Sequence, residues 1–555
     1  MRKRSLRKKG KDPDDFHIEI LDFNQDREVY DGSLEENIIS QVEEPGTIPV
    51  RPAPQRPQQR VRRKKVRRPE NLDDFQEEKL PPSPKEKARR KRNRQLTALT
   101  YGFVALFICM MAYLVYFNQV RARSFIRDPH NARLDSMAEH IARGPIVDRN
   151  GQVLAETVTT DNGEQYRSYP YGSLFAHVVG YDTKGKAGLE SVFNFELLTS
   201  HASYLEQLKN DLQSKKNPGD TIVTTLDTNL QQAAAQSLGS NKGAAVAIEP
   251  DTGKVLLMYS NPTFDPESVS EQWDQLNSDP NSALLNRVTQ GAYAPGSTFK
   301  IVTALEYLRE NGTDANYAYE CNGSYTYSDT TIHCYNGAAH GMEDLESSFA
   351  NSCNASFVNI GLHLDPSKYR TTADSLLFNK KLPSQLPAKK SQFVVDKDTG
   401  PGEMMMTAMG QGNTQISPYH LALIGCAVAN DGLLMKPYLV TEINNDQNKN
   451  VKKYSPKSYK QLLSAEEAAV LQRYMRSVVT DGTGRALNSG SYTAAAKTGT
   501  AEYSSDKNKS HSLFVGYANV DHPDIVVAVV IESADQSGAT AIAVAKSVFD
   551  AYYNQ

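Results

Sequence analysis

The 555-residue chain is poor in the residue patterns that usually bind metals. It has five cysteines, and neither a C-x-x-C nor an H-E-x-x-H sequence occurs in it. Because these spacings mark many zinc sites, we predict no zinc, no other metal and no cofactor. Cys321 and Cys334 are close enough in sequence to form a disulfide, and the alternative of free buried thiols stays open.

Charged side chains are absent from residues 95–120, which are almost wholly apolar. A bilayer core takes about 20 such residues as a helix, and a buried core helix rarely runs this long without a charge. A signal peptide is excluded because the segment begins too far into the chain and lacks a small-residue cleavage site after it. We predict an uncleaved single membrane helix over residues 96–117.

The tail before this helix has few large apolar groups. Residues 1–95 cannot bury enough surface to offset their ordering entropy, so we predict a mostly disordered tail. Basic residues are denser before the apolar segment than after it, which places the tail in the cytoplasm and the C-terminal bulk outside the cell or in the periplasm. The basic tract at 51–69 lacks a nucleic-acid-binding fold motif, so we expect a topology signal, with contact to anionic lipid as an alternative.

Histidines with the spacing of a catalytic partner are also lacking. His333, His340 and His511 stand alone in the sequence, and we interpret them as structural or surface residues. The chain has instead three short motifs in one order: S-T-F-K at 297–300, S-C-N at 352–354 and K-T-G at 497–499. Each match alone is weak evidence. Together they supply the groups of a serine acyl-transfer enzyme that works without histidine.

The first motif is predicted to place a nucleophile at the start of a helix. Pro295 and Gly296 precede Ser297, and apolar residues then recur at helical spacing as far as Gly312. Lys300 lies three residues on and projects from the same face. To accept a proton near neutral pH its pKa must fall from about 10.4, a change of about 4 kcal/mol. Burial and a second cation would lower it.

The two lysines are predicted to divide the work. We expect Lys300 to be neutral and to take the Ser297 proton, while Lys497 stays charged and holds substrate anions. Ser352 would relay a proton to the leaving amine. Asn354 would hydrogen-bond the lysine and a substrate amide.

The K-T-G segment is predicted to form a strand edge that binds substrate. Gly499 would let the edge come close to the peptide, and the hydroxyls of Thr498 and Thr500 suit a terminal carboxylate. The backbone N–H groups of Ser297 and Thr500 would form an oxyanion hole, in which one donor is typically worth about 3 kcal/mol.

The fold expected is α+β and multidomain. Two strands flank the turn at 250–253, two more flank 521–524, and the K-T-G segment forms a fifth. These five strands would form one antiparallel sheet covered by helices, closed by a helix over 539–553. Residues 295–480 are predicted to be mostly helix and loop, forming a helical lobe with the site at the junction.

A separate β-rich pedestal is expected over residues 118–220, between the membrane helix and the catalytic domain at 221–555. Its clearest feature is a hairpin at 143–157, where D-R-N-G at 148–151 makes the turn. It contains no obvious nucleophile–base pair, so we interpret it as a spacer.

With these motifs the chain resembles class B penicillin-binding proteins, the monofunctional peptidoglycan D,D-transpeptidases. G-Q-G at 410–412, G-T-G at 482–484 and R-G-x-I-x-D-R-N-G at 143–151 also match the family, and the resemblance covers roughly 120–555. The middle residue of S-x-N is Cys353, which leaves the two working side chains intact. No module of glycosyltransferase size precedes residue 220, which argues against a bifunctional enzyme.

The resemblance implies a penicilloyl-serine transferase fold and a known chemistry. Ser297 would be acylated by a stem peptide ending in D-Ala-D-Ala, D-Ala would leave, and a neighbouring stem's amine would complete the cross-link. It also implies acylation by β-lactams and contact between the pedestal and a glycan polymerase of the SEDS type. A D,D-carboxypeptidase, a β-lactamase and a β-lactam-sensing receptor are the rival functions.

Overall fold

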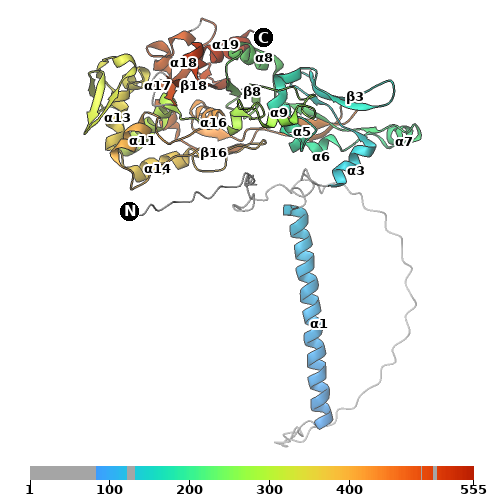
Figure 1. Ribbon diagram of the computed structural model, residues 1–555. Helices are drawn as coiled ribbons and strands as arrows, with labels where there is room; N and C mark the ends of the chain where they lie inside the picture. The colour runs from blue at the N-terminus through green and yellow to red at the C-terminus, as the bar shows by residue number, and fades with distance from the viewer. Residues whose placement is uncertain (1–82, 122–131, 489, 504–508, 555) are drawn as a thin grey trace, which may run out of the picture. The chain divides into compact units, whose positions relative to one another are not determined.

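The computed structural model describes residues 83–554, apart from 122–131, 489 and 504–508 (Figure 1). Its first element is the helix α1 (Pro84–Tyr116), which continues into the π-helical turn η1 (Phe117–Arg121). Residues 84–121 form the one helix among the described residues that is long and apolar enough to cross a membrane, with a mean hydropathy of 2.1 over its most apolar window.

The prediction of disorder over 1–95 is wrong for its last residues. Residues 84–95 are helical and belong to α1, whereas residues 1–82 lie outside the described part of the chain. Lys, Arg, Glu and Ala are strong helix formers, and a helix that is already nucleated in the apolar segment extends through them at low cost.

The structure that follows α1 in the chain contains a six-stranded sheet. The hairpin predicted at 143–157 is present as the antiparallel pair β2–β3, and β2 pairs in parallel with β6. Two further strands come from far along the chain, within the segment predicted to be catalytic. The strand order is β15 (Asn450–Lys453), β14 (Val440–Asn444), β6 (Thr221–Thr224), β2 (Ile146–Val147), β3 (Val153–Thr159) and β4 (Gln165–Ser168).

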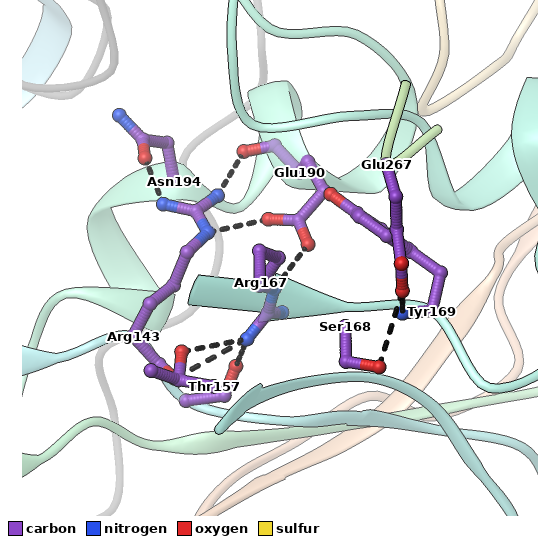
Figure 2. A network of polar contacts seen from close by, with 9 residues as sticks. Arg143, Thr157, Arg167, Ser168, Tyr169, Glu190, Asn194 and Glu267 are labelled. Atoms are coloured by element: carbon purple, nitrogen blue, oxygen red, sulfur yellow. Dashed lines mark hydrogen bonds and ion pairs between the residues drawn. The ribbon is translucent and has the colours of Figure 1, made fainter. Parts of the chain in front are cut away.

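Two arginines and one glutamate form a buried ion network beside this sheet (Figure 2). The Nε atoms of Arg143 and Arg167 lie 2.5 and 2.8 Å from the two carboxylate oxygens of Glu190, which is fully buried at the start of α5 (Gly188–Val192). Arg143 also donates to Asn194 in α6 (Asn194–Leu197). Burial works to raise the pKa of Glu190, but the two guanidinium groups outweigh it and the pKa lies below its usual value.

Neutralising this glutamate should destabilise the protein. In Glu190→Gln the two arginines stay buried without their counter-charge, so we expect a loss of about 3–5 kcal/mol, measured as a lower denaturation midpoint of the detergent-solubilised protein. The exposed Glu164→Gln is the matched control and should leave the midpoint unchanged. The stabilisation by Glu190 is fully present above the usual glutamate pKa and is lost as the pH falls through the lowered pKa of Glu190 in the folded protein. Acidification should therefore narrow the difference in midpoint between the wild type and Glu190→Gln. An unchanged midpoint at pH 7 would contradict the assignment.

The predicted five-stranded antiparallel sheet is confirmed. Strands from opposite ends of this domain lie in the order β17 (Ala494–Glu502), β18 (Ser510–Ala518), β19 (Ile525–Ile531), β7 (Gly243–Ile248) and β8 (Val255–Asn261). On one face α8 (Thr228–Leu238) packs beside α19 (Ala541–Tyr553), the predicted closing helix (Figure 1). The wholly buried α16 (Pro418–Ala429) covers the other face. β19 lies at the centre of this three-layer arrangement and is therefore buried on both faces, which is why it is apolar at every position.

The middle of the chain forms the helical lobe, but it also contains short strands that the sequence analysis did not predict. These strands are only three to five residues long and lack the strong alternation that reveals longer strands. The helices are α11 (Lys300–Asn311), α12 (Leu345–Ala350), α13 (Asn354–His363), α14 (Pro366–Ser375), α15 (Pro401–Ala408) and α17 (Ala465–Thr480). Four strands precede α12: β9 (Tyr319–Cys321), β10 (Ser324–Tyr327), β11 (Thr330–His333) and β12 (Gly341–Glu343).

The remaining described elements are short. The other strands are β1 (Ile141–Ala142), β5 (Asn217–Pro218), β13 (Leu433–Met435) and β16 (Ser458–Gln461); the other helices are α3 (Ala132–His140), α4 (Ala176–Val179), α7 (Tyr204–Leu212), α9 (Trp273–Asn277), α10 (Arg287–Gln290) and α18 (Ala534–Ser537).

Candidate active site

Ser297 lies in a single 3₁₀ turn, η3 (Gly296–Phe299), directly before α11. Gly296 has a φ of +54°, and a Cβ there would lie 2.5 Å from the carbonyl oxygen of Thr500 in β17. Only glycine allows the turn to come this close to the strand. The N–H of Gly296 also donates to the carbonyl of Gly410 at 2.8 Å, which gives the G-Q-G motif a role in holding the turn.

Lys300 is the first residue of α11, and its amine is held by the S-C-N turn. Nζ donates to the Ser352 carbonyl at 2.7 Å, to Oδ1 of Asn354 at 2.8 Å and to Oγ of Ser352 at 3.2 Å. The side chain is fully buried, with Nζ 5.3 Å from the centre of the Phe357 ring. The hydrogen bond predicted between Asn354 and the lysine is present. The other side of its amide, Nδ2, donates to the His333 carbonyl at 3.1 Å.

Lys497 reaches the same serine from the strand side. Its Nζ donates to Oγ of Ser352 at 2.9 Å and to the Thr498 carbonyl at 3.2 Å, and its side chain is also fully buried. The hydroxyl of Ser352 thus bridges two lysines from distant parts of the chain. Ser352 has a left-handed backbone with a φ of +56°. Such a conformation is uncommon for a non-glycine residue and is typical of residues held in place at a functional site.

Both lysines have pKa values below their usual range. Burial lowers the pKa of Lys300 to about 8. Burial and the charge of Lys300 lower the pKa of Lys497 well below its usual value. The division of charge between them, with Lys300 neutral and Lys497 charged, stays a prediction. The sequence could not reveal how far burial lowers the two pKa values, since both lysines are buried only in the folded protein.

The K-T-G strand edge closes the site on its other side. A Cβ at Gly499 would lie 2.9 Å from Cγ2 of Thr298, so the glycine lets the strand pack closely against the serine turn. The hydroxyls of Thr498 and Thr483 are 2.6 Å apart, which ties the G-T-G motif to this edge. Thr500 is exposed at the surface of the strand.

These groups share one cleft of about 1090 Å³. Both lysines lie beneath its surface and are absent from its lining. The predicted site residues that line it are Ser297, Ser352, Asn354, Thr498, Gly499 and Thr500. A smaller cavity of about 590 Å³ borders the Arg143–Glu190 network and contains none of the predicted catalytic residues.

The structure also brings together residues that the sequence analysis had set apart. Cys321 and Cys334 are free thiols with sulfurs 3.6 Å apart, so they form no disulfide here. His340 and Cys353 lie against them. The signal that could have shown this is the occurrence of three of the five cysteines within residues 321–353. His511, as predicted, has a structural place, accepting from the N–H of Ser533 at 3.0 Å and stacking on Tyr503.

The family follows from comparison with known proteins. Residues 243–554 match the model of the penicillin-binding protein transpeptidase domain, which is more than half of the chain. The chain belongs to this family. Residues 143–222 match the penicillin-binding protein A dimerisation domain. The penicillin-binding protein described here is 29% identical to the peptidoglycan D,D-transpeptidase PbpA of Mycolicibacterium smegmatis, over 82% of this chain and 97% of that protein.

Solved structures agree with this assignment. The D,D-transpeptidase domain of a peptidoglycan glycosyltransferase from Eggerthella lenta is 31% identical with a TM-score of 0.67, covering 75% of this chain and 99% of that one. The imipenem acyl-enzyme complex of penicillin-binding protein A from M. tuberculosis is 27% identical with a TM-score of 0.67, covering 75% and 100%. The predicted fold and the predicted class, a class B penicillin-binding protein acting by serine acyl transfer, are thus confirmed.

Proposed function

We propose that this protein cross-links peptidoglycan by transferring a stem peptide through an acyl-enzyme on Ser297, with release of D-Ala, and that β-lactams acylate the same serine. The observation that carries the proposal is the Ser352 hydroxyl, which bridges the amines of Lys300 and Lys497 in the cleft that Ser297 lines. A hydroxyl between two desolvated amines can pass protons in either direction. This is what an acyl transfer needs, because its two half-reactions move the proton in opposite senses.

The first half-reaction forms the acyl-enzyme. Oγ of Ser297 attacks the carbonyl carbon of the penultimate D-Ala, and its proton passes to a neutral lysine amine. The N–H groups of Ser297 and Thr500 stabilise the developing oxyanion. The C–N bond then breaks, and the terminal D-Ala leaves as its amine takes up a proton through Ser352.

The second half-reaction reverses these proton movements. The amine of a neighbouring stem attacks the acyl carbon, gives its excess proton to the lysine pair through Ser352, and displaces Oγ of Ser297, which is reprotonated. Because burial and the charge of Lys300 both disfavour a second proton on the pair, one amine is available as the acceptor at each stage. The hydroxyls of Thr498 and Thr500, with Lys497 beneath them, suit the terminal carboxylate of the donor peptide.

The domain plan completes the proposal. Residues 1–95 form the cytoplasmic tail, 96–117 the membrane span, 118–220 the pedestal and 221–555 the transpeptidase domain, which acts outside the cytoplasmic membrane. The denser basic cluster at the start of α1, before its apolar segment, supports this orientation. The pedestal contacts a polytopic glycan polymerase of the SEDS type, and its extended sheet, which takes in β14 and β15 from the catalytic segment, would connect that contact to the site.

An acceptor experiment separates transpeptidation from its rivals. Detergent-solubilised full-length protein is given a donor ending in D-Ala-D-Ala and increasing concentrations of an amine acceptor, and the products are counted by mass spectrometry. We expect the cross-linked product to rise with acceptor at the expense of the hydrolysed donor. If the amount of hydrolysed donor stays the same as the acceptor concentration rises, the protein is a carboxypeptidase. Rapid release of a labelled β-lactam would mean a β-lactamase, and a stable adduct with no peptide turnover would mean a sensor.

A further inference from the structure

Three thiols and one imidazole converge behind the S-C-N turn. They come from four separate places: Cys321 ends β9, Cys334 follows β11, His340 precedes β12 and Cys353 is the residue before α13. One ligand atom from each lies within 4.8 Å of all the others. The three cysteines are buried and the histidine is partly buried.

Three distances between these atoms match those of a tetrahedral zinc site. Zinc bonds sulfur at about 2.3 Å and nitrogen at about 2.0–2.1 Å, so a tetrahedron has S···S edges of about 3.8 Å and S···N edges of about 3.5 Å. The Cys321–Cys334 and Cys334–Cys353 sulfurs are 3.6 and 3.7 Å apart. The Cys321 sulfur is 3.4 Å from Nδ1 of His340. A disulfide would require about 2.05 Å between two of these sulfurs.

The strands that carry the ligands are short and pack mainly on α13. β9–β12 and β10–β11 are separate two-stranded pairs, and most residues of β10 and β11 are at least partly exposed. Two-stranded pairs of this length are marginal in water on their own. The buried cluster that joins them consists of the three cysteines with Ala355. Small subdomains without an adequate apolar core are commonly stabilised by a structural metal.

We propose that Cys321, Cys334, His340 and Cys353 bind one zinc ion in a closed structural site that sets the position of the S-C-N turn. Four protein ligands leave no open position, so the metal takes no part in the chemistry. Cys353 stands between Ser352 and Asn354, so the metal would fix the backbone that presents both side chains to Lys300. The N–H of Ser356 donates to the Cys353 sulfur at 3.4 Å, the kind of contact that supports a metal-bound thiolate.

The metal site would also shape one wall of the cleft. Cys334 and His340 flank the segment 335–338 in the sequence, and residues of this stretch line the same cleft as the K-T-G edge. Loss of the metal would therefore loosen both the proton relay and the wall that faces the substrate. This consequence for the reaction rests on the proposed function, whereas binding of the metal does not.

Metal content is the direct test. Full-length protein is purified in detergent with a non-thiol reductant, and its zinc is measured by elemental analysis. We expect about one zinc per chain in the wild type and a loss of at least tenfold in Cys334→Ser and His340→Ala. Cys426→Ser is the matched control, because Cys426 is a buried free thiol in α16 away from the cluster, and it should keep its zinc.

A cobalt titration keeps the test decisive if the variants fail to fold. Wild-type protein is stripped with a chelator and titrated with Co²⁺ alone; we expect the intense visible bands of tetrahedral thiolate-bound cobalt, saturating at one equivalent and abolished by Zn²⁺. Absence of zinc and of these bands would overturn the proposal. So would a Cys321–Cys334 disulfide found by peptide mapping of protein taken from membranes with its thiols blocked.

Kinetics test the positioning role separately. Stripping the metal should lower the maximal rate of β-lactam acylation by about 10–100-fold, with little change in the β-lactam concentration that gives half-maximal rate, and added Zn²⁺ should restore the rate. Changes of equal size in the maximal rate and in the half-maximal concentration, or no change in either, would reject the positioning role. The metal site itself would still be tested by the elemental analysis.

Discussion

Ser297→Ala should abolish covalent labelling by a fluorescent penicillin. Removing the hydroxyl removes the atom proposed to form the acyl bond, and nucleophile deletions in serine acyl enzymes commonly cost about 10⁴-fold or more. The fold should be unaffected, because Ser297 lies on the wall of an open cleft and the contacts that hold its turn are made by Gly296 and Thr298. The measurement is the labelled band in a denaturing gel as a function of time.

The matched control is Ser278→Ala, an exposed serine after α9, which should label at the wild-type rate. Labelling of Ser297→Ala at a comparable rate would show that another residue is the nucleophile. Mass spectrometry of the labelled peptide would then identify it. A change in denaturation midpoint of the alanine variant would mean that the loss reflects folding, so the midpoint is recorded alongside.

The pH dependence of acylation should reveal which lysine accepts the serine proton. Only a neutral amine can accept, so the rate should rise about tenfold per pH unit below the pKa of the base and level above it. The pKa of Lys300 is lowered to about 8, and that of Lys497 is lowered well below its usual value. A rising limb centred near pH 8 assigns the base to Lys300. A limb at clearly lower pH assigns it to Lys497.

Substitution makes this assignment independent of the pH profile. Lys300→Arg keeps the charge but removes the proton acceptor, because a guanidinium stays protonated, and the acylation rate should fall by about 10²–10⁴-fold. The exposed Lys389→Arg should change neither the rate nor the limb. Full activity in Lys300→Arg, with the limb unmoved, would exclude Lys300 as the base and leave Lys497 in that role.

Local features of the site were predictable because they depend on neighbours in sequence. Gly296 permits a positive φ, α11 begins within three residues of Ser297, and Lys300 follows at helical spacing, so the serine and the lysine belong to one turn in any fold that keeps this helix. The strands of the central sheet were predictable for the same reason. β7, β8 and β19 are continuous apolar runs next to turn residues, as fully buried strands are.

Features that depend on distant partners were not predictable. The C-x-x-C rule assumes that ligands share one turn, whereas Cys321, Cys334, His340 and Cys353 are brought together by two separate strand pairs. The short strands that do so have too few residues to show a period. The addition of β14 and β15 to the pedestal sheet likewise depends on pairing over more than two hundred residues.

The amino-acid sequence alone determined the family, the long apolar segment and the central sheet, since motif order, apolar runs and helical spacing are properties of short segments. Only the tertiary structure decided the burial of the two lysines, which lowers their pKa values, and the meeting of three thiols with an imidazole. The physical reason is that desolvation and ligand geometry depend on which distant atoms surround a group, and no short segment contains that information.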